Sequence, residues 1–170
     1  MTGVPILSIF SGGGFLDMGF INEGFQPTAA FEINEAFIQA YNFGLQSYIK
    51  KSKKQKIQIT GIKHFEIENA IDLSKRDEQR LIRKLHGQTI EGIIGGPPCQ
   101  DYSTGGKNLG INGQRGQLIL SYLEIVRLSR PNFIFFENVN GLLNTSAHQP
   151  VFFNLIKELE GLGYTVWYDM

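Results

Sequence analysis

The chain has 170 residues, of which 42% are hydrophobic, and it carries 16 basic and 16 acidic side chains. This length fits one globular domain with a hydrophobic core and is too short for two full ones, so we expect residues 1–170 to form a single domain. The balanced charge excludes the strongly basic composition of many nucleic-acid binders. No apolar run is long enough to span a bilayer, so we expect a soluble cytoplasmic protein without membrane contact.

The first third of the chain predicts a β–α–β unit. Val4–Phe10 is an apolar run that ends in serine and three glycines, a pattern typical of a buried strand entering a glycine turn. A short helix is expected from Leu16 until the stop at Gly24, and a second strand at Pro27–Phe31. Asn34 is placed to cap a helix that runs to about Tyr41.

Beyond this helix the pattern is weaker and then becomes regular again. Five lysines lie between residues 50 and 56, and we interpret them as a solvated loop rather than as phosphate contacts. A weak strand at 65–71 ends at Asp72 and is followed by a charged helix at 74–85. The later predicted elements are strands at 91–94, 132–136 and 164–168, and helices at 118–128 and 152–162. Strands that alternate with helices predict an α/β fold with a Rossmann-like, doubly wound, mostly parallel sheet.

Each unusual cluster of residues follows a predicted strand, where open parallel sheets bind their ligands. Glycines at a strand-to-helix turn allow close approach of a cofactor, and Glu32, 18 positions beyond Gly14, can accept hydrogen bonds from ribose hydroxyls. Asp17 stands where a dinucleotide fingerprint has its third glycine. The pattern therefore favours a smaller nucleoside cofactor, and a tight turn without a ligand is the alternative.

The chain has a single cysteine, Cys99, which excludes an internal disulfide and a cysteine-rich zinc site. It follows two prolines that stiffen the backbone and hold the thiol beyond a strand end, as a nucleophile requires. A small buried hydrophobe is the alternative interpretation. Glu137 follows a wholly apolar strand, where a charged carboxylate is unfavourable because it loses solvation. Its presence there favours a catalytic role for Glu137.

Together these motifs resemble the amino-terminal part of the cytosine-5 DNA methyltransferase family. Phe10-Ser11-Gly12-Gly13-Gly14 is similar to the first motif of the family, Gly96-Pro97-Pro98-Cys99-Gln100 to its catalytic loop, and Phe136-Glu137-Asn138-Val139 to its acidic motif. The order and approximate spacing also agree. The resemblance covers essentially the whole chain and implies the fold of the S-adenosylmethionine-dependent methyltransferases.

The resemblance implies a role for each matched residue. Cys99 would attack carbon 6 of a flipped cytosine, Glu137 would bind ring nitrogen N3, and Asn138 would brace the proline-cysteine loop. Ser103 and Arg115 are candidate DNA backbone contacts, with ordinary loop residues as the alternative. The residues expected to bind S-adenosylmethionine are Phe10, Gly12, Gly14, Glu32, Asp72, Pro98 and Leu118.

Two departures from the family concern the cofactor site. Phe15 stands where the family usually has a further glycine, and Ser8 where an acidic residue is frequent.

The family continues with a base-contacting segment, a target-recognition region and a closing element, none of which is present. We therefore expect the domain to be incomplete and to pair with a second polypeptide or to self-associate.

The resemblance implies a restriction-modification enzyme that is active only when the missing elements are supplied in trans. Three alternatives stand against it, and the first is a truncated or regulatory chain that only binds S-adenosylmethionine. A tRNA cytosine methyltransferase would carry the same motifs. A nicotinamide-dependent oxidoreductase is disfavoured by the missing third glycine.

Overall fold

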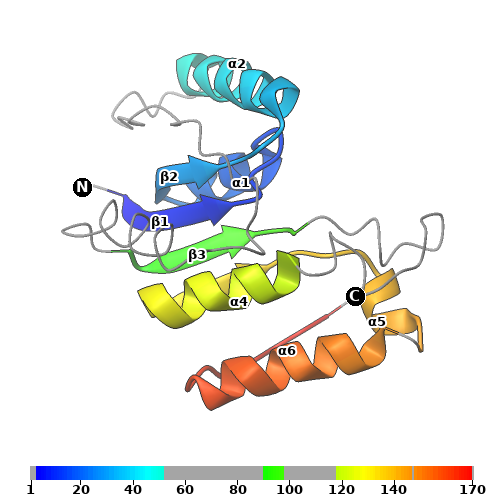
Figure 1. Cartoon of the computed structure of the whole chain (residues 1–170). Helices are drawn as coiled ribbons and strands as arrows, with labels where there is room; N and C mark the ends of the chain where they lie inside the picture. The colour runs from blue at the N-terminus through cyan, green and yellow to red at the C-terminus, as the bar shows by residue number, and fades with distance from the viewer. Residues whose placement is uncertain (1–2, 52–89, 98–117, 147, 170) are drawn as a thin grey trace.

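A four-stranded, all-parallel sheet forms the centre of the fold, with strand order β2-β1-β3-β4 (Figure 1). The computed structural model describes residues 3–51, 90–97, 118–146 and 148–169. Its strands are β1 (Val4–Ile9), β2 (Phe25–Phe31), β3 (Gly92–Gly95) and β4 (Phe133–Phe136). The predicted doubly wound α/β class is confirmed, while the strand expected at 65–71 and the helix expected at 74–85 lie outside the described residues.

Helices cover both faces of the sheet. On one face, α1 (Phe15–Asn22) and α2 (Glu35–Lys51) enclose a smaller core cluster that consists of Ile21, Ala30, Tyr41 and Leu45. On the other face, α4 (Leu118–Ser129) and α6 (Gln149–Gly161) pack over a larger core cluster. That cluster joins residues of β1 and β3, such as Leu7 and Ile93, to Tyr122 of α4 and Leu155 of α6. The short α5 (Gly141–Asn144) follows β4.

The pairing of β1 with β2 contains one irregularity, and the sequence explains it. Ile6 is paired with Pro27, whereas Leu7 is paired with Ala29, so Thr28 is left between them. Proline has no backbone N–H to donate to the ladder, and bulges commonly accommodate it. The Thr28 hydroxyl donates to the Ile6 carbonyl at 3.1 Å, which restores a polar contact at this point.

Asn34 caps α2 as predicted, but the helix is ten residues longer than expected. The Asn34 side-chain oxygen accepts hydrogen bonds from the backbone N–H groups of Ala36 at 3.0 Å and Phe37 at 3.3 Å. The predicted end near Tyr41 is wrong because α2 continues to Lys51. Leu45 and Tyr48 extend the apolar stripe of Tyr41 at helical spacing and pack into the smaller core cluster.

The strand predicted at 164–168 does not form, and this prediction is wrong. Residues 164–169 have no regular secondary structure and pair with none of the described strands, β4 included. Instead, Tyr164 and Val166 pack against the larger core cluster, and the Tyr164 hydroxyl donates to the Pro131 carbonyl at 2.7 Å. Alternate residues of this segment, Tyr164 and Val166, are therefore partly buried without a neighbouring strand.

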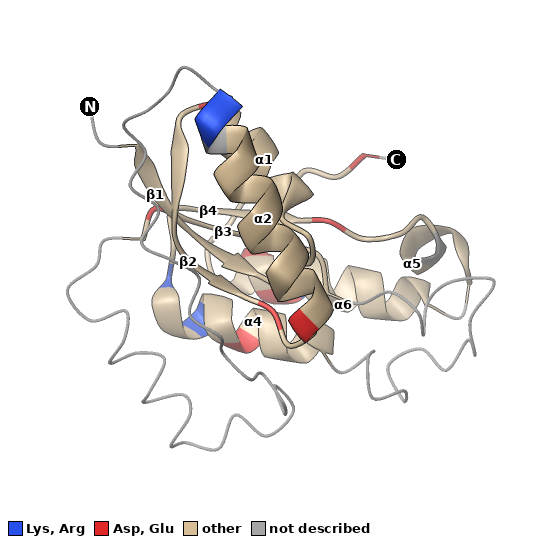
Figure 2. Cartoon of the chain, turned by 90° about the horizontal axis from the view of Figure 1, so that it is seen from above, with Lys and Arg blue, Asp and Glu red and all other residues tan. Residues whose placement is uncertain are grey.

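Charged residues in the described part of the chain lie mostly at or near the ends of helices and strands (Figure 2). Lys50 and Lys51, the described members of the lysine group, occupy the last turn of α2. None of the described helices is both long enough and apolar enough to cross a membrane.

Candidate active site

The carboxyl ends of all four strands meet at one edge of the sheet, because every strand pair is parallel. The glycine turn follows β1, Glu32 follows β2, Gly96 and Pro97 follow β3, and Glu137 follows β4. In Figure 1 the arrowheads of β1, β2 and β3 accordingly point the same way. Residues far apart in the sequence are thereby collected where open parallel sheets bind ligands.

The segment Phe10–Gly14, named here the cofactor turn, has an unusual backbone. Phe10, Gly12 and Gly14 all have positive φ values, of 56°, 53° and 82°. This conformation is uncommon for phenylalanine and persists only where surrounding contacts enforce it. Two backbone hydrogen bonds do so: Ser11 N–H donates to the Phe31 carbonyl at 3.0 Å, and Gly14 N–H donates to the Ser11 carbonyl at 2.9 Å.

Glu32 joins the cofactor turn to the end of β2. Its Oε2 accepts the Gly12 N–H at 2.9 Å, and its Oε1 accepts the N–H groups of Ile33 and Asn34, both at 2.8 Å. The carboxylate is half-buried, so its remaining lone pairs can still accept bonds from a ligand hydroxyl. Nothing lies within 4 Å of a Cβ built at Gly12, which leaves open space above the turn. This arrangement fits a nucleoside ribose.

A second group of contacts joins the ends of β3 and β4. The Glu137 N–H donates to the Gly95 carbonyl at 2.9 Å and so extends the strand pairing by one residue. The Glu137 carboxylate lies directly over Gly96, where an added Cβ would be 2.5 Å from Oε2. Asn138 Nδ2 donates to the Pro97 carbonyl at 3.3 Å, while its Oδ1 accepts the Val139 N–H at 2.9 Å. The segment that leads to Cys99 is therefore held from β4.

The structure describes only some of the residues predicted for the site. Phe10 is partly buried against the larger core cluster, and Leu118 is the first residue of α4. Both departures in the cofactor motif are described: Phe15 is 85% exposed, and Ser8 is fully buried. Cys99, Pro98, Asp72, Ser103 and Arg115 lie outside the described residues.

Sequence reasoning missed one buried polar group beside the cofactor turn. Asp17 of α1 is fully buried and accepts hydrogen bonds from the hydroxyls of Ser8, at 2.7 Å, and Tyr41. Burial raises the pKa of Asp17 from 3.8 to about 6, and its two hydroxyl partners lower it less than burial raises it. The available signal was an aspartate within an otherwise apolar helix, at the position noted only for its missing glycine.

Comparison with known proteins assigns the chain to a family. A family model described as C-5 cytosine-specific DNA methylase matches residues 4–170. The chain belongs to this family. The match covers both the cofactor turn and the Glu137–Asn138 segment.

The chain is similar to proteins that are named type II methyltransferases. M.NmeDI of Neisseria meningitidis serogroup C is 37% identical over 163 residues, which cover 94% of this chain and 37% of that protein. M.NgoPII of Neisseria gonorrhoeae is 35% identical over 167 residues, which cover 98% and 42%. The chain thus spans about two fifths of the length of these relatives.

A solved structure shows that the fold is shared. It is described as a DNA modification methyltransferase encoded within a prophage of E. coli, and it matches this chain with a TM-score of 0.66 at 23% identity. The match covers 93% of this chain and 38% of that one.

Proposed function

We propose that this chain forms the cofactor-binding and catalytic part of an enzyme that transfers a methyl group from S-adenosylmethionine to carbon 5 of cytosine in DNA. One observation carries the proposal: the Gly12–Glu32 contact and the Glu137–Gly96 contact lie at the same edge of the sheet. Family membership supports the reaction class, and relatives named type II methyltransferases support DNA as the substrate and a restriction-modification setting.

The cofactor turn and Glu32 would hold S-adenosylmethionine, which when bound supplies an electrophilic methyl group. Glu32 accepts hydrogen bonds from the ribose hydroxyls, as its free lone pairs allow. The backbone of Gly12 and Gly14 allows the ligand to approach closely. Phe10, Asp72, Pro98 and Leu118 complete the proposed pocket, with Phe10 packed against the adenine.

Cys99 and Glu137 would act on a cytosine that is extruded from the duplex. The Cys99 thiolate forms a bond to carbon 6, which places an electron pair at carbon 5, while Glu137 binds N3 and stabilises the developing charge. Carbon 5 would then take the methyl group as the bond from that group to the S-adenosylmethionine sulfur breaks, and S-adenosylhomocysteine would leave. Loss of the carbon 5 proton returns electrons to the ring, expels the Cys99 sulfur from carbon 6 and frees the enzyme. Asn138, through the Pro97 carbonyl, keeps Cys99 in place for these steps.

A covalent trap tests this chemistry. Fluorine at carbon 5 cannot leave as a proton would, so DNA in which every cytosine is 5-fluorocytosine should retain Cys99 as an adduct. The chain would be mixed with S-adenosylmethionine, this DNA and, in trans, the segment of M.NgoPII that this chain does not span. We expect a band shift on a denaturing gel, and none with Cys99→Ser.

Three results would count against the proposal. An adduct that persists in Cys99→Ser would remove Cys99 from the mechanism. Adduct formation with 5-fluorocytosine RNA but not DNA would indicate a tRNA-type substrate. Cofactor binding without any adduct would support the alternative, a chain that only binds S-adenosylmethionine.

A further inference from the structure

Three elements meet at one buried carboxylate behind the cofactor turn. Asp17 is the third residue of α1, Ser8 lies in β1 two residues before the turn begins, and Tyr41 lies in α2. Both hydroxyls donate to the Asp17 carboxylate, which has no exposed surface. The contacts therefore connect β1, which precedes the cofactor turn, to α1, which follows it, and to α2, which packs on α1.

Burial of the Asp17 carboxylate costs free energy. Among the described residues no cation pairs with it, and the two hydroxyls are its side-chain partners. Burial raises the pKa of Asp17, and burial together with the nearby Asp17 raises the pKa of Tyr41. Apolar residues of similar size are often at least as stabilising as buried charged groups, so stability alone is a weak reason for an aspartate here.

The cluster touches the cofactor turn at both ends. Ser8 precedes Phe10 by two residues in the fully buried part of β1. The Tyr41 ring lies against the Gly14 backbone so closely that a Cβ at Gly14 would be 2.7 Å from Tyr41 Cδ2. Gly14 also has φ of 82°, so both its backbone conformation and its contact with Tyr41 require glycine.

Glu32 contacts the same turn at its middle, through the Gly12 N–H at 2.9 Å. A hydrogen bond of this kind weakens steeply when its donor is moved or tilted, so the position of the turn decides whether Glu32 keeps its orientation. We propose that Asp17 is a positioning residue for the cofactor turn, which through Ser8 and Tyr41 fixes Gly12 and Gly14 relative to Glu32. The inference rests on the proposed function, because it makes Asp17 a determinant of cofactor affinity without cofactor contact.

Four variants separate positioning from a general contribution to stability. Asp17→Ala removes the cluster, and Tyr41→Phe removes one of its hydrogen bonds if Asp17→Ala does not fold. Asp17→Asn keeps the shape and can bond both hydroxyls, so it serves as the conservative rescue. Tyr122→Phe is the matched control, since it also deletes a buried tyrosine hydroxyl, which donates to the Phe135 carbonyl on the other side of the sheet at 3.1 Å.

Two measurements are made on each folded variant: affinity for S-adenosylhomocysteine by calorimetry, and amide hydrogen exchange at Gly12 and Gly14 without ligand. We expect affinity to fall about tenfold in Asp17→Ala and about threefold in Tyr41→Phe, as expected for the loss of one or two hydrogen bonds. Exchange at both glycines should accelerate in the same variants. Asp17→Asn and Tyr122→Phe should resemble the wild type in both measurements.

The two readouts distinguish failure of the inference from failure of the proposed function. Equal affinity and equal glycine exchange in Tyr41→Phe and Tyr122→Phe would overturn the positioning role. Loss of affinity in Asp17→Asn as large as that in Asp17→Ala would also overturn it. If the wild type binds no S-adenosylhomocysteine, the proposed cofactor is wrong, and the exchange rates alone decide whether Asp17 positions the turn.

Discussion

At the scale of single residues, the site depends on close approaches that one methyl group would block. Gly96 is the clearest case, because an added Cβ would be 2.5 Å from the Glu137 carboxylate and 3.1 Å from its carbonyl oxygen. The Glu137 side chain would have to turn away from the segment that leads to Cys99. The sequence identified Gly96 as part of a motif, but only the structure shows that its missing side chain makes room for Glu137.

Gly96→Ala should therefore abolish most methyl transfer while leaving affinity for S-adenosylmethionine within about twofold, because the Glu32 contacts are untouched. Glu137→Gln should have the same profile. Gly19→Ala is the matched control: nothing lies within 4 Å of its added Cβ, and alanine in a helix stabilises by about 0.5–1 kcal/mol. Steady-state kinetics and calorimetry on the reconstituted enzyme measure both quantities. Equal turnover in Gly96→Ala and Gly19→Ala would contradict this account of Gly96.

Asp17 predicts a specific pH dependence of stability. Its folded-state pKa of about 6 lies above its ordinary value of 3.8, so the folded protein binds this proton more tightly than the unfolded chain does. The stabilising contribution is fully present below pH 3.8 and is lost as the pH rises through 6, at a cost of about 3 kcal/mol.

Asp17→Asn has no such proton and should escape this loss. The difference in unfolding free energy between Asp17→Asn and the wild type should therefore shift by about 2.5 kcal/mol in favour of the variant between pH 4 and pH 7.5, because a small part of the loss has already occurred at pH 4. Urea unfolding at several pH values measures this difference. Parallel curves for the two proteins would show that Asp17 does not titrate in the folded state as described.

At the scale of elements, sequence patterns predicted which helices and strands form, and in what order, better than they predicted where each one ends. The apolar runs and glycine turn that predicted β1, α1 and β2 are local signals, and they were sufficient. The end of α2 was missed because Leu45 and Tyr48 lie beyond the expected boundary, and their burial depends on tertiary contacts with α1 and β2. The expected strand at 164–168 failed for a related reason, since a strand needs a neighbour that the pattern alone does not supply.

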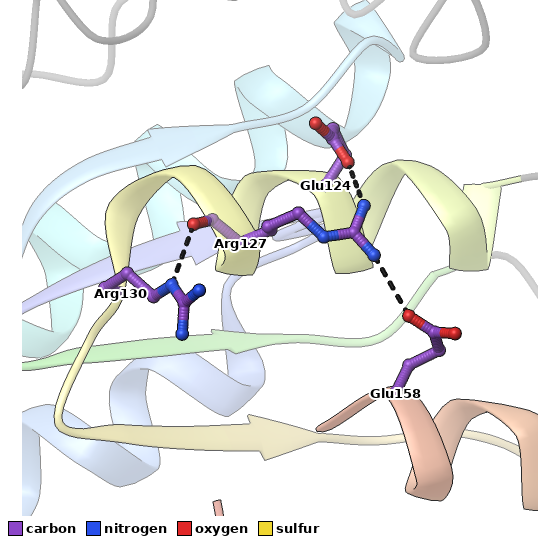
Figure 3. Close-up of polar contacts among 4 residues, drawn as sticks. All are labelled: Glu124, Arg127, Arg130 and Glu158. Carbon is purple, nitrogen blue, oxygen red and sulfur yellow. Dashed lines mark hydrogen bonds and ion pairs between the residues drawn. The ribbon is translucent and has the colours of Figure 1, made fainter. Parts of the chain in front are cut away.

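The attachment of α6 to α4 illustrates which contacts carry an element. Arg127 of α4 forms ion pairs with Glu124 at 2.6 Å and with Glu158 of α6 at 3.0 Å, and Arg130 Nε donates to the Arg127 carbonyl at 3.2 Å (Figure 3). The Arg127 and Glu158 side chains are 45% and 42% exposed, so solvent screens their attraction. Leu155 of the same helix is buried in the larger core cluster.

Arg127→Ala should therefore lower the free energy of unfolding by less than about 1 kcal/mol, and Leu155→Ala by about 2–5 kcal/mol. Chemical denaturation of the two variants at low and high salt measures both effects. The small Arg127 effect should diminish further in 1 M salt, whereas the Leu155 effect should not. A larger loss in Arg127→Ala than in Leu155→Ala would mean that the ion pairs, not apolar packing, hold α6.

At the scale of the whole molecule, the described sheet ends at β4, whose outer edge pairs with no described strand. Phe135 of this strand is 44% exposed. Apolar strand edges are templates for association, so we predict that the chain pairs with a second polypeptide or self-associates through β4.

Sedimentation velocity over a range of concentrations should show association of the purified chain. Phe135→Lys should weaken it, because a charge on an edge strand opposes pairing. Phe43→Lys is the control, since Phe43 is also exposed but lies on α2. A stable monomer at high concentration that binds no dye specific for exposed apolar surface would contradict the prediction.

The central claim is that the cofactor turn and Glu32 bind S-adenosylmethionine, and calorimetric titration tests it most directly. The wild-type chain should bind S-adenosylmethionine and S-adenosylhomocysteine with one site each and should not bind NAD. Glu32→Ala should weaken binding about tenfold or more, because a charged hydrogen-bond acceptor is lost. Glu23→Ala is the control: it removes an exposed carboxylate at the end of α1 and should leave binding unchanged. Binding of NAD, or unchanged affinity in Glu32→Ala, would contradict the account.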